Sequence, residues 1–122
     1  MYTLSNQPVA VVTGVGPGLG AGLVRRSAAS YAVAILARTA DYLKALAGKI
    51  RQSAATVLDL SCDVSDRTQI IEAFRAIRMH LGEPEVLLYN VGSSTFGTTT
   101  EIMPDQYEAD WRINTLGTGC PA

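Results

Sequence analysis

The 122-residue sequence contains few of the residues that build disulfide frameworks or metal centres. It has two cysteines, Cys62 and Cys120, with no CxxC pair, and a single histidine, His80. Two isolated thiols give no disulfide framework, and we expect both to stay reduced in a cytoplasmic protein. Because histidines and cysteines do not cluster, we also expect no metal site.

The sequence also has no long apolar run and no excess of either charge. Its apolar stretches are far shorter than the roughly 18 residues that a membrane span needs. The opening residues, MYTLSNQP, have neither the basic nor the apolar region of a secretory signal. Ten basic residues are balanced by eleven acidic ones, so no basic patch indicates a nucleic-acid partner. We therefore expect a cytoplasmic protein that engages neither membranes nor nucleic acids.

The sequence does contain an alternation of short apolar runs and amphipathic segments. With 48 % apolar and 17 % charged residues it is typical of one globular domain. Strands are predicted at residues 8–13, 32–37, 55–61 and 85–89. Helices are predicted at 18–29 and 40–51, after a cap at Ser65, and from Pro104 onward. This order predicts an α/β fold, doubly wound, with a parallel sheet and helices on both faces.

The last predicted helix carries a stripe of residues at helical spacing. Tyr107, Trp111 and Asn114 fall at positions i, i+4 and i+7. The side chain of Asn114 is therefore expected to face the protein, where a buried amide needs hydrogen-bond partners. A satisfied structural asparagine and a functional one are both compatible with this pattern.

The stretch TGVGPGLG, residues 13–20, places a glycine at every second position of the first strand-to-helix turn. Such a turn offers a phosphate the free N–H groups of a helix N-terminus, and glycine lets the backbone come close. A P-loop is excluded, because Leu19 and Gly20 stand where it requires Lys and Ser or Thr. A loose Rossmann pattern fits as Gly16-x-Gly18-x-x-Ala21, with a merely tight turn as the alternative.

The spacing Thr13-Gly14-x-x-x-Gly18-x-Gly20 resembles the cofactor motif of the short-chain dehydrogenase/reductase family. The segments CDV at 62–64 and YNVG at 89–92 are similar to family motifs that follow its third and fourth strands. Asn114 in WRINTLGTG matches the asparagine of the family's catalytic tetrad. The resemblance covers essentially the whole chain, but only the N-terminal half of a usual member. It implies one truncated NAD(P)-binding domain, residues 1–122, with a Rossmann-like sheet of about four strands in the order 3-2-1-4.

The resemblance also implies a set of cofactor-binding residues at the carboxyl ends of the strands. Asp63 would meet the adenine, Asn90 would lie near the ribose on the nicotinamide side, and Asn114 would belong to a proton relay. The complete cofactor-binding set is Thr13, Gly14, Gly16, Pro17, Gly18, Leu19, Gly20, Arg38, Thr39, Asp63, Val64, Asn90, Val91 and Gly92.

Arg38 bears on which cofactor would bind. It stands about 20 positions after the glycines, where an acidic residue normally accepts hydrogen bonds from the ribose hydroxyls of NAD. A guanidinium at this place can pair with a 2′-phosphate, and Thr39 adds a hydroxyl donor. NADP(H) is therefore favoured over NAD(H), with a solvated arginine at the start of a helix as the alternative.

The sequence departs from the family pattern in several places. The family's catalytic Ser and Tyr-x-x-x-Lys are absent. None of the tyrosines is followed by a lysine four residues later. The general acid of hydride transfer is therefore missing. Tyr89 and Val91 replace the usual Asn and Ala. Ser30, in place of a glycine, is expected to adopt a left-handed turn. The closing GTGCPA, 117–122, is expected to break the last helix.

Several functions stay open on this reading. One is an NADP(H)-dependent oxidoreductase that transfers hydride between the nicotinamide and a carbonyl or secondary alcohol; this chain alone would be catalytically incompetent, and a small-molecule substrate would bind only in a complete enzyme. Another is a non-catalytic nucleotide-binding or pairing module, and a third is an inactive fragment. With an apolar strand at the edge of half a domain, we also expect self-association.

Overall fold

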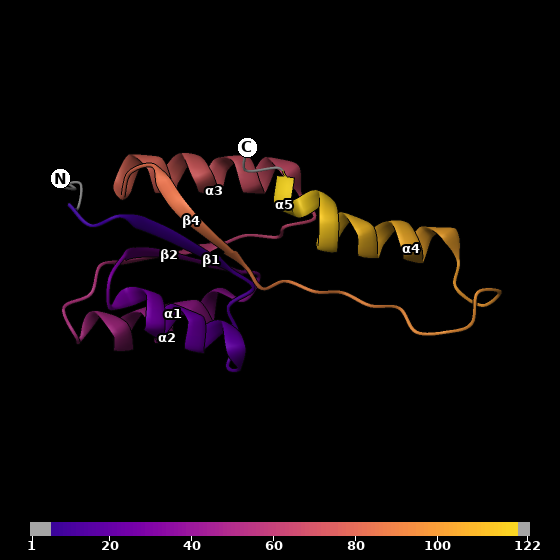
Figure 1. Ribbon diagram of the computed structural model, residues 1–122, viewed down its shortest axis with the longest axis horizontal. Helices are drawn as coiled ribbons and strands as arrows, with labels where there is room; N and C mark the ends of the chain where they lie inside the picture. Colours follow the sequence, from indigo (N-terminus) through magenta and orange to yellow (C-terminus); the bar gives the residue numbers. More distant parts are fainter. Residues whose placement is uncertain (1–5, 120–122) are drawn as a thin grey trace.

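A computed structural model describes residues 6–119 and contains one parallel sheet of four strands (Figure 1). The strands are β1 (Val9–Thr13), β2 (Ala32–Ala37), β3 (Val57–Ser61) and β4 (Pro84–Tyr89). All pairs are parallel and the order is β3-β2-β1-β4. The predicted α/β class and strand order are therefore confirmed, and the strand bounds differ from the predicted ones by two residues or fewer.

Helices cover both faces of the sheet (Figure 1). α1 (Leu19–Ala28) and α2 (Ala40–Arg51) pack on one face, and α3 (Arg67–His80) packs on the other. Strand β2 shows how this follows from the sequence, because successive side chains of a strand point to opposite faces. Ile35 packs with the α1 and α2 side, whereas Leu36 packs with the α3 side. An entirely apolar strand is needed where both faces are covered.

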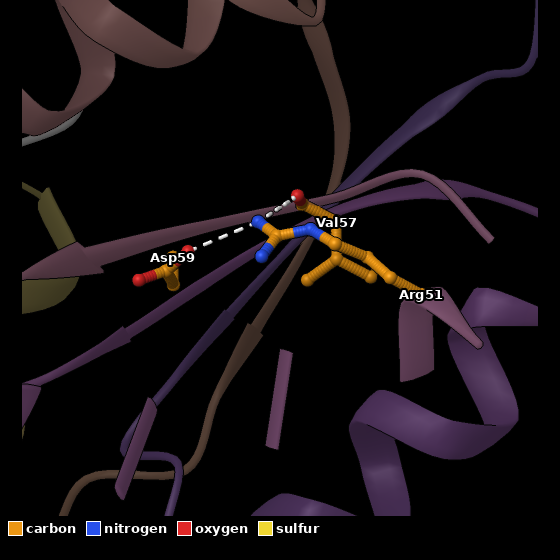
Figure 2. Close-up of polar contacts among 3 residues, drawn as sticks. All are labelled: Arg51, Val57 and Asp59. Carbon is orange, nitrogen blue, oxygen red and sulfur yellow. Dashed lines mark hydrogen bonds and ion pairs between the residues drawn. The ribbon is translucent and has the colours of Figure 1, made fainter. Parts of the chain in front are cut away.

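The two edges of the described sheet differ in how they are protected. At the β3 edge, Arg51 at the end of α2 donates hydrogen bonds from Nη2 to the Val57 carbonyl oxygen at 2.7 Å and to Asp59 Oδ1 at 3.0 Å (Figure 2). This contact occupies a backbone acceptor on an edge strand, a common way to discourage pairing with another chain. At the β4 edge Leu87 is 38 % exposed, so an apolar side chain lies open there.

Two local predictions about turns are wrong. Asp66, not Ser65, caps α3, because its Oδ1 accepts from the backbone N–H of Thr68 and Gln69 at 3.0 and 3.3 Å. Ser30 does not adopt a left-handed conformation; among the described non-glycine residues only Ala54 has a positive φ, 63°. The N–H groups of Ser30 and Tyr31 both bond to the Ser27 carbonyl, so the chain leaves α1 by a tight right-handed turn.

The last helical segment comprises α4 (Pro104–Trp111), a π-helical turn η1 (Arg112–Leu116) and α5 (Gly117–Gly119). α4 begins at Pro104 as predicted, projects beyond the sheet (Figure 1) and contains no buried residue. The predicted buried stripe is wrong: Tyr107 and Trp111 are 72 % and 45 % exposed, and Asn114 is exposed. The prediction assumed a packing partner for α4 and a regular helical period, whereas η1 changes the angular register after Trp111.

The predicted break after Leu116 is also wrong within the described part of the chain. Gly117–Gly119 continue as a helical turn. Gly117 is buried against the Tyr89 side chain, where a Cβ atom would collide with the hydroxyl. A glycine is tolerated in this helix because it gives Tyr89 room. Cys120 and Pro121 lie outside the described residues. No helix in residues 6–119 is long and apolar enough to cross a membrane.

Candidate functional site

The carboxyl ends of all four strands open onto one cleft of about 450 Å³. In open α/β sheets, ligands bind outside the carboxyl ends of the strands. The predicted residues that line the cleft are Thr13, Gly14, Gly16, Arg38, Thr39, Asp63, Val64, Asn90, Val91 and Gly92. Sequence positions up to 79 residues apart are thus gathered at one edge of the sheet, as the motif order predicts.

Some predicted residues do not line this cleft. Pro17, Gly18 and Leu19 lie at the exposed start of α1, with Leu19 68 % exposed. Gly20 is buried inside the turn and is not open to a ligand. These four residues are therefore near the cleft without lining it: residues 17–19 are exposed, and Gly20 packs against the backbone of the turn.

The glycines of the first turn fall into two groups. Gly14 has a φ of +84°, and a Cβ there would lie 2.1 Å from the Asn90 carbonyl oxygen. A Cβ on Gly20 would lie 2.5 Å from the Gly14 carbonyl oxygen. By contrast, a Cβ on Gly16 or Gly18 would meet no atom within 4 Å. The first pair is therefore required by the packing of the turn, and the second pair leaves open space that a ligand can approach.

The start of α1 is suited to a negative charge. Gly18 is its N-cap, no side chain caps it, and no acidic residue lies in its first turn. The first N–H groups of a helix have no intrahelical partner and lie at the positive end of its dipole. A helix start without a competing carboxylate, beside an open glycine turn, can bind a phosphate.

Arg38 and Asp63 follow the neighbouring strands β2 and β3. The Arg38 side chain is exposed, while its carbonyl accepts a hydrogen bond from Ser61 Oγ at 3.1 Å. Asp63 Oδ1 accepts from the hydroxyl and the N–H of Ser65 at 2.7 and 2.9 Å. These bonds, with a smaller effect from the charge of Arg38, lower the pKa of Asp63. The cleft thus places a hydrogen-bonded carboxylate near an exposed guanidinium.

Asn90 and Val91 hold the β4 side of the cleft against the glycine turn. The Asn90 N–H donates to the Thr13 carbonyl at 2.9 Å, and its Nδ2 donates to the Gly14 carbonyl at 3.3 Å. A Cβ on Gly14 would also lie 2.9 Å from Val91 Cγ2. Asn90 therefore fixes the shape of the turn as well as lining the cleft.

The Asn114 side chain does not line the cleft, although its neighbour Ile113 does. Its Oδ1 accepts from the Ser93 N–H at 2.8 Å, and its Nδ2 donates to the Ser93 carbonyl at 2.7 Å. The expected amide partners therefore exist, but they belong to the loop after β4.

Asp110 also holds this loop, and the sequence reasoning did not identify it. The carboxylate of Asp110 accepts hydrogen bonds from Ser93 Oγ at 2.6 Å and from the Thr95 N–H at 2.8 Å. These bonds lower its pKa. A signal existed in the sequence: Asp110 precedes Asn114 by four positions, which is helical spacing, and the Ser/Thr-rich loop supplies the donors.

Two further features bear on the chemistry of the cleft. Cys62 is buried with 2 % of its surface exposed, and burial, followed by the charges of Asp63 and Asp66, raises the pKa of its thiol to about 11. It is therefore protonated at neutral pH and is no nucleophile. Residues 6–119 contain no group of three or more His, Cys, Asp or Glu side chains placed to hold a metal ion.

A second hollow, of about 580 Å³, lies near the opposite ends of the strands, between the ends of α1 and α2. Arg25 and Lys49 line it, each in the last turn of its helix. Helix C-termini carry the negative end of the dipole, so these cations complement the helices. The second hollow is therefore a less favourable anion site than the start of α1, because it lies at the negative ends of two helix dipoles.

The sequence model of the family described as short chain dehydrogenase matches residues 8–119. The chain belongs to this family. Elsinochrome reductase 1 from Elsinoe fawcettii is 29 % identical over 111 residues, which are 89 % of this chain and 42 % of that protein. Thus the chain spans less than half of that relative.

Solved structures of short-chain dehydrogenases have the same arrangement. A short-chain dehydrogenase/reductase from Serratia marcescens superposes with a TM-score of 0.87 at 30 % identity, covering 93 % of this chain and 47 % of that one. A mutant actinorhodin polyketide ketoreductase with NADPH superposes with a TM-score of 0.88 at 25 % identity, covering 99 % of this chain and 46 % of that one. The predicted family and the Rossmann-like fold are confirmed.

Proposed function

We propose that the cleft binds NADP(H), as the nucleotide-binding part of a short-chain oxidoreductase. The observation that carries the proposal is the open space at Gly16 and Gly18 beside an uncapped helix start, with Arg38 on the adjacent strand end. These groups suit a pyrophosphate and a 2′-phosphate respectively. The family membership and the ketoreductase solved with NADPH support the same assignment.

The strand order suggests how the halves of the cofactor divide along the cleft. Arg38 and Asp63 follow β2 and β3, on one side of β1, and we assign them to the 2′-phosphate and the adenine. Asn90, Val91 and Gly92 follow β4, on the other side of β1, and we assign them to the nicotinamide side. Parallel neighbours lie roughly 4.8 Å apart, and β1 lies between β2 and β4, so the two groups of residues are separated by about two strand spacings.

Bound nicotinamide would supply a hydride donor or acceptor for a carbonyl or a secondary alcohol. The residues of this chain would bind and orient it; none of the tyrosines in the sequence has a lysine four positions later to act with it as a general acid. We therefore propose that these 122 residues bind the cofactor without completing hydride transfer. Asn114 serves this chain by holding Ser93, and its place in a proton relay belongs to the activity proposed for the whole protein.

The proposal is tested by titrating the chain with NADPH and with NADH, following the fluorescence of the reduced nicotinamide. We expect saturable binding of both, with NADPH bound about tenfold more tightly because Arg38 gains a charged partner. Equal affinities would remove the assignment of Arg38 to a 2′-phosphate. No saturable signal with either nucleotide would refute the proposed function.

We also propose that the chain self-associates through β4. Strand β4 is at an edge of the described sheet, and Leu87 on it is 38 % exposed. Substituting Leu87→Lys places a charge on this edge and should shift the chain toward the monomer in light scattering. A wild-type chain that is already monomeric at high concentration would contradict the proposal.

A cytoplasmic location is proposed for the same protein. Cys62 is a buried free thiol in the described chain, which suits a reducing compartment. Fractionation of cells that express the protein is the test, with recovery in the membrane or secreted fraction as the contrary result.

A further inference from the structure

The loop that follows β4 is held by two side chains of the last helical segment. Asp110 on α4 accepts hydrogen bonds from Ser93 Oγ at 2.6 Å and from the Thr95 N–H at 2.8 Å. Asn114 on η1 binds the N–H and the carbonyl of Ser93 at 2.8 and 2.7 Å. Both polar backbone groups of Ser93 and its hydroxyl are thus fixed by residues 17 to 21 positions further along the chain.

This contact reaches the cleft although Asp110 does not. Ser93 and Ile113 line the cleft, whereas Asp110 and Asn114 contact Ser93 without lining the cleft themselves. A carboxylate is well suited to such a support, because hydrogen bonds to an ionised acceptor are stronger than neutral ones.

We propose that Asp110 is a positioning residue for the nicotinamide half of the cofactor, because it fixes Ser93, which lines the cleft on the β4 side, and the neighbouring Thr95. This inference rests on the proposed function. It assigns a role to a residue that touches neither the cleft nor the glycine turn. It also explains why the exposed helix α4 has an acidic residue, Asp110, on the side that faces the loop.

The effect of Asp110 should be confined to one side of the cleft. Ser93 follows β4, whereas Arg38 and Asp63 follow β2 and β3, with β1 between them. A ligand that contains only the adenine half should therefore not depend on Asp110. General damage to the fold would weaken both halves alike, so the comparison separates positioning from stability.

The test compares Asp110→Ala with Glu108→Ala, which removes another carboxylate from the same helix. Calorimetric titration uses NADPH and adenosine 2′,5′-bisphosphate as the two probes. We expect Asp110→Ala to weaken NADPH binding about tenfold and to leave the bisphosphate unchanged, with Glu108→Ala unchanged for both. Asp110→Asn should be intermediate, since its Oδ1 can still accept from Thr95 and its Nδ2 can donate to Ser93 Oγ.

Hydrogen exchange gives a readout that needs no ligand. The Ser93 and Thr95 amides should exchange faster in Asp110→Ala than in wild type or Glu108→Ala. Unchanged exchange at these amides, or equal weakening of both probes, would overturn the inference while leaving the proposed function standing. If the wild-type chain binds neither probe, the proposed function is wrong, and so is the proposed effect of Asp110 on cofactor binding.

Discussion

The Tyr89 hydroxyl donates a hydrogen bond to the Ile113 carbonyl oxygen at 2.5 Å, joining the end of β4 to the π-helical turn. Tyr89 stands where the family resemblance places an asparagine. Its ring needs the space that Gly117 leaves open, since a Cβ there would collide with the hydroxyl. Tyr89 and the glycine at position 117 both depart from the family pattern, and the structure shows that these two residues contact each other.

Removing this hydroxyl should destabilise the chain. Tyr89→Phe leaves a carbonyl of the π-helical turn without its side-chain donor, and we expect the free energy of unfolding to fall by about 1 kcal/mol. Urea denaturation measures it. Tyr107→Phe is the matched control, because Tyr107 is 72 % exposed and should be neutral. Equal stability of Tyr89→Phe and wild type would show that the bond contributes nothing.

Substitutions at two glycines of the first turn should have different effects, one on the stability of the fold and the other on NADPH affinity. Gly14→Ala forces a Cβ against the Asn90 carbonyl at a φ of +84°, and should lower the free energy of unfolding by about 2 kcal/mol or more. Gly16→Ala meets no protein atom within 4 Å, so its stability should be unchanged or up to about 1 kcal/mol higher. Its NADPH affinity should nevertheless fall, because the methyl group occupies phosphate space.

The control for the glycine pair is Gly22→Ala, which is exposed in α1 and meets no atom within 4 Å. It should fold at least as well as wild type and bind NADPH normally. If Gly16→Ala binds NADPH as tightly as Gly22→Ala does, the open space at Gly16 is not where the pyrophosphate lies.

Reversing the charge at Arg38 should reverse the cofactor preference. An Arg38→Asp chain repels a 2′-phosphate and can accept hydrogen bonds from ribose hydroxyls, so NADPH affinity should drop about tenfold or more while NADH affinity holds or rises. Arg75→Asp, on the exposed side of α3, changes the net charge equally and should alter neither. A parallel fall in both affinities for Arg38→Asp would point to damage rather than selectivity.

The clamp at the β3 edge should contribute a small amount of stability. Arg51→Met keeps most of the side-chain length but loses the hydrogen bond to the Val57 carbonyl and the ion pair with Asp59. Because Arg51 is 48 % exposed, we expect a loss of at most about 1 kcal/mol. The variant should aggregate more readily if the clamp protects the edge, and light scattering during storage measures this. A variant that is as stable and as soluble as wild type would count against that role.

Cys62 should react only when the fold opens. Its pKa is raised from 9.0 to about 11, so a neutral thiol is favoured in the folded state. The corresponding stabilisation is full below about pH 9 and is lost as the pH rises through the folded value. In a Cys120→Ser chain, labelling by iodoacetamide at pH 8 should be slow until urea unfolds the protein. Rapid labelling of the folded chain would contradict the burial of Cys62.

Much of the fold could be predicted because the strands are apolar throughout and are separated by amphipathic segments. Val33 and Ile35 alternate with Ala34 and Leu36, and only a sheet covered on both faces buries all of them. The glycine turn was recognisable because a Cβ atom on Gly14 or Gly20 would collide with the backbone, so the packing of the turn requires glycine at both positions.

The errors concern interactions that a local pattern does not encode. Ser65 and Asp66 are adjacent polar residues, and which one caps α3 depends on the turn after β3. The burial of Asn114 was inferred from a regular period, which the π-helical turn breaks. The bonds from Asp110 to the Ser93 loop cross 15 to 17 positions of sequence, and helical spacing to Asn114 does not by itself say which segment Asp110 contacts.

The most direct test of the account is to map nucleotide binding on the amide signals of the ¹⁵N-labelled chain. On addition of NADPH we predict shifts at the carboxyl ends of the strands, at Gly14, Gly16, Arg38, Asp63 and Gly92. The N–H groups near the second hollow, around Arg25 and Lys49, should stay unchanged. Shifts concentrated at Arg25 and Lys49, or no shift at Gly14 and Gly16 at saturating NADPH, would contradict the central claim.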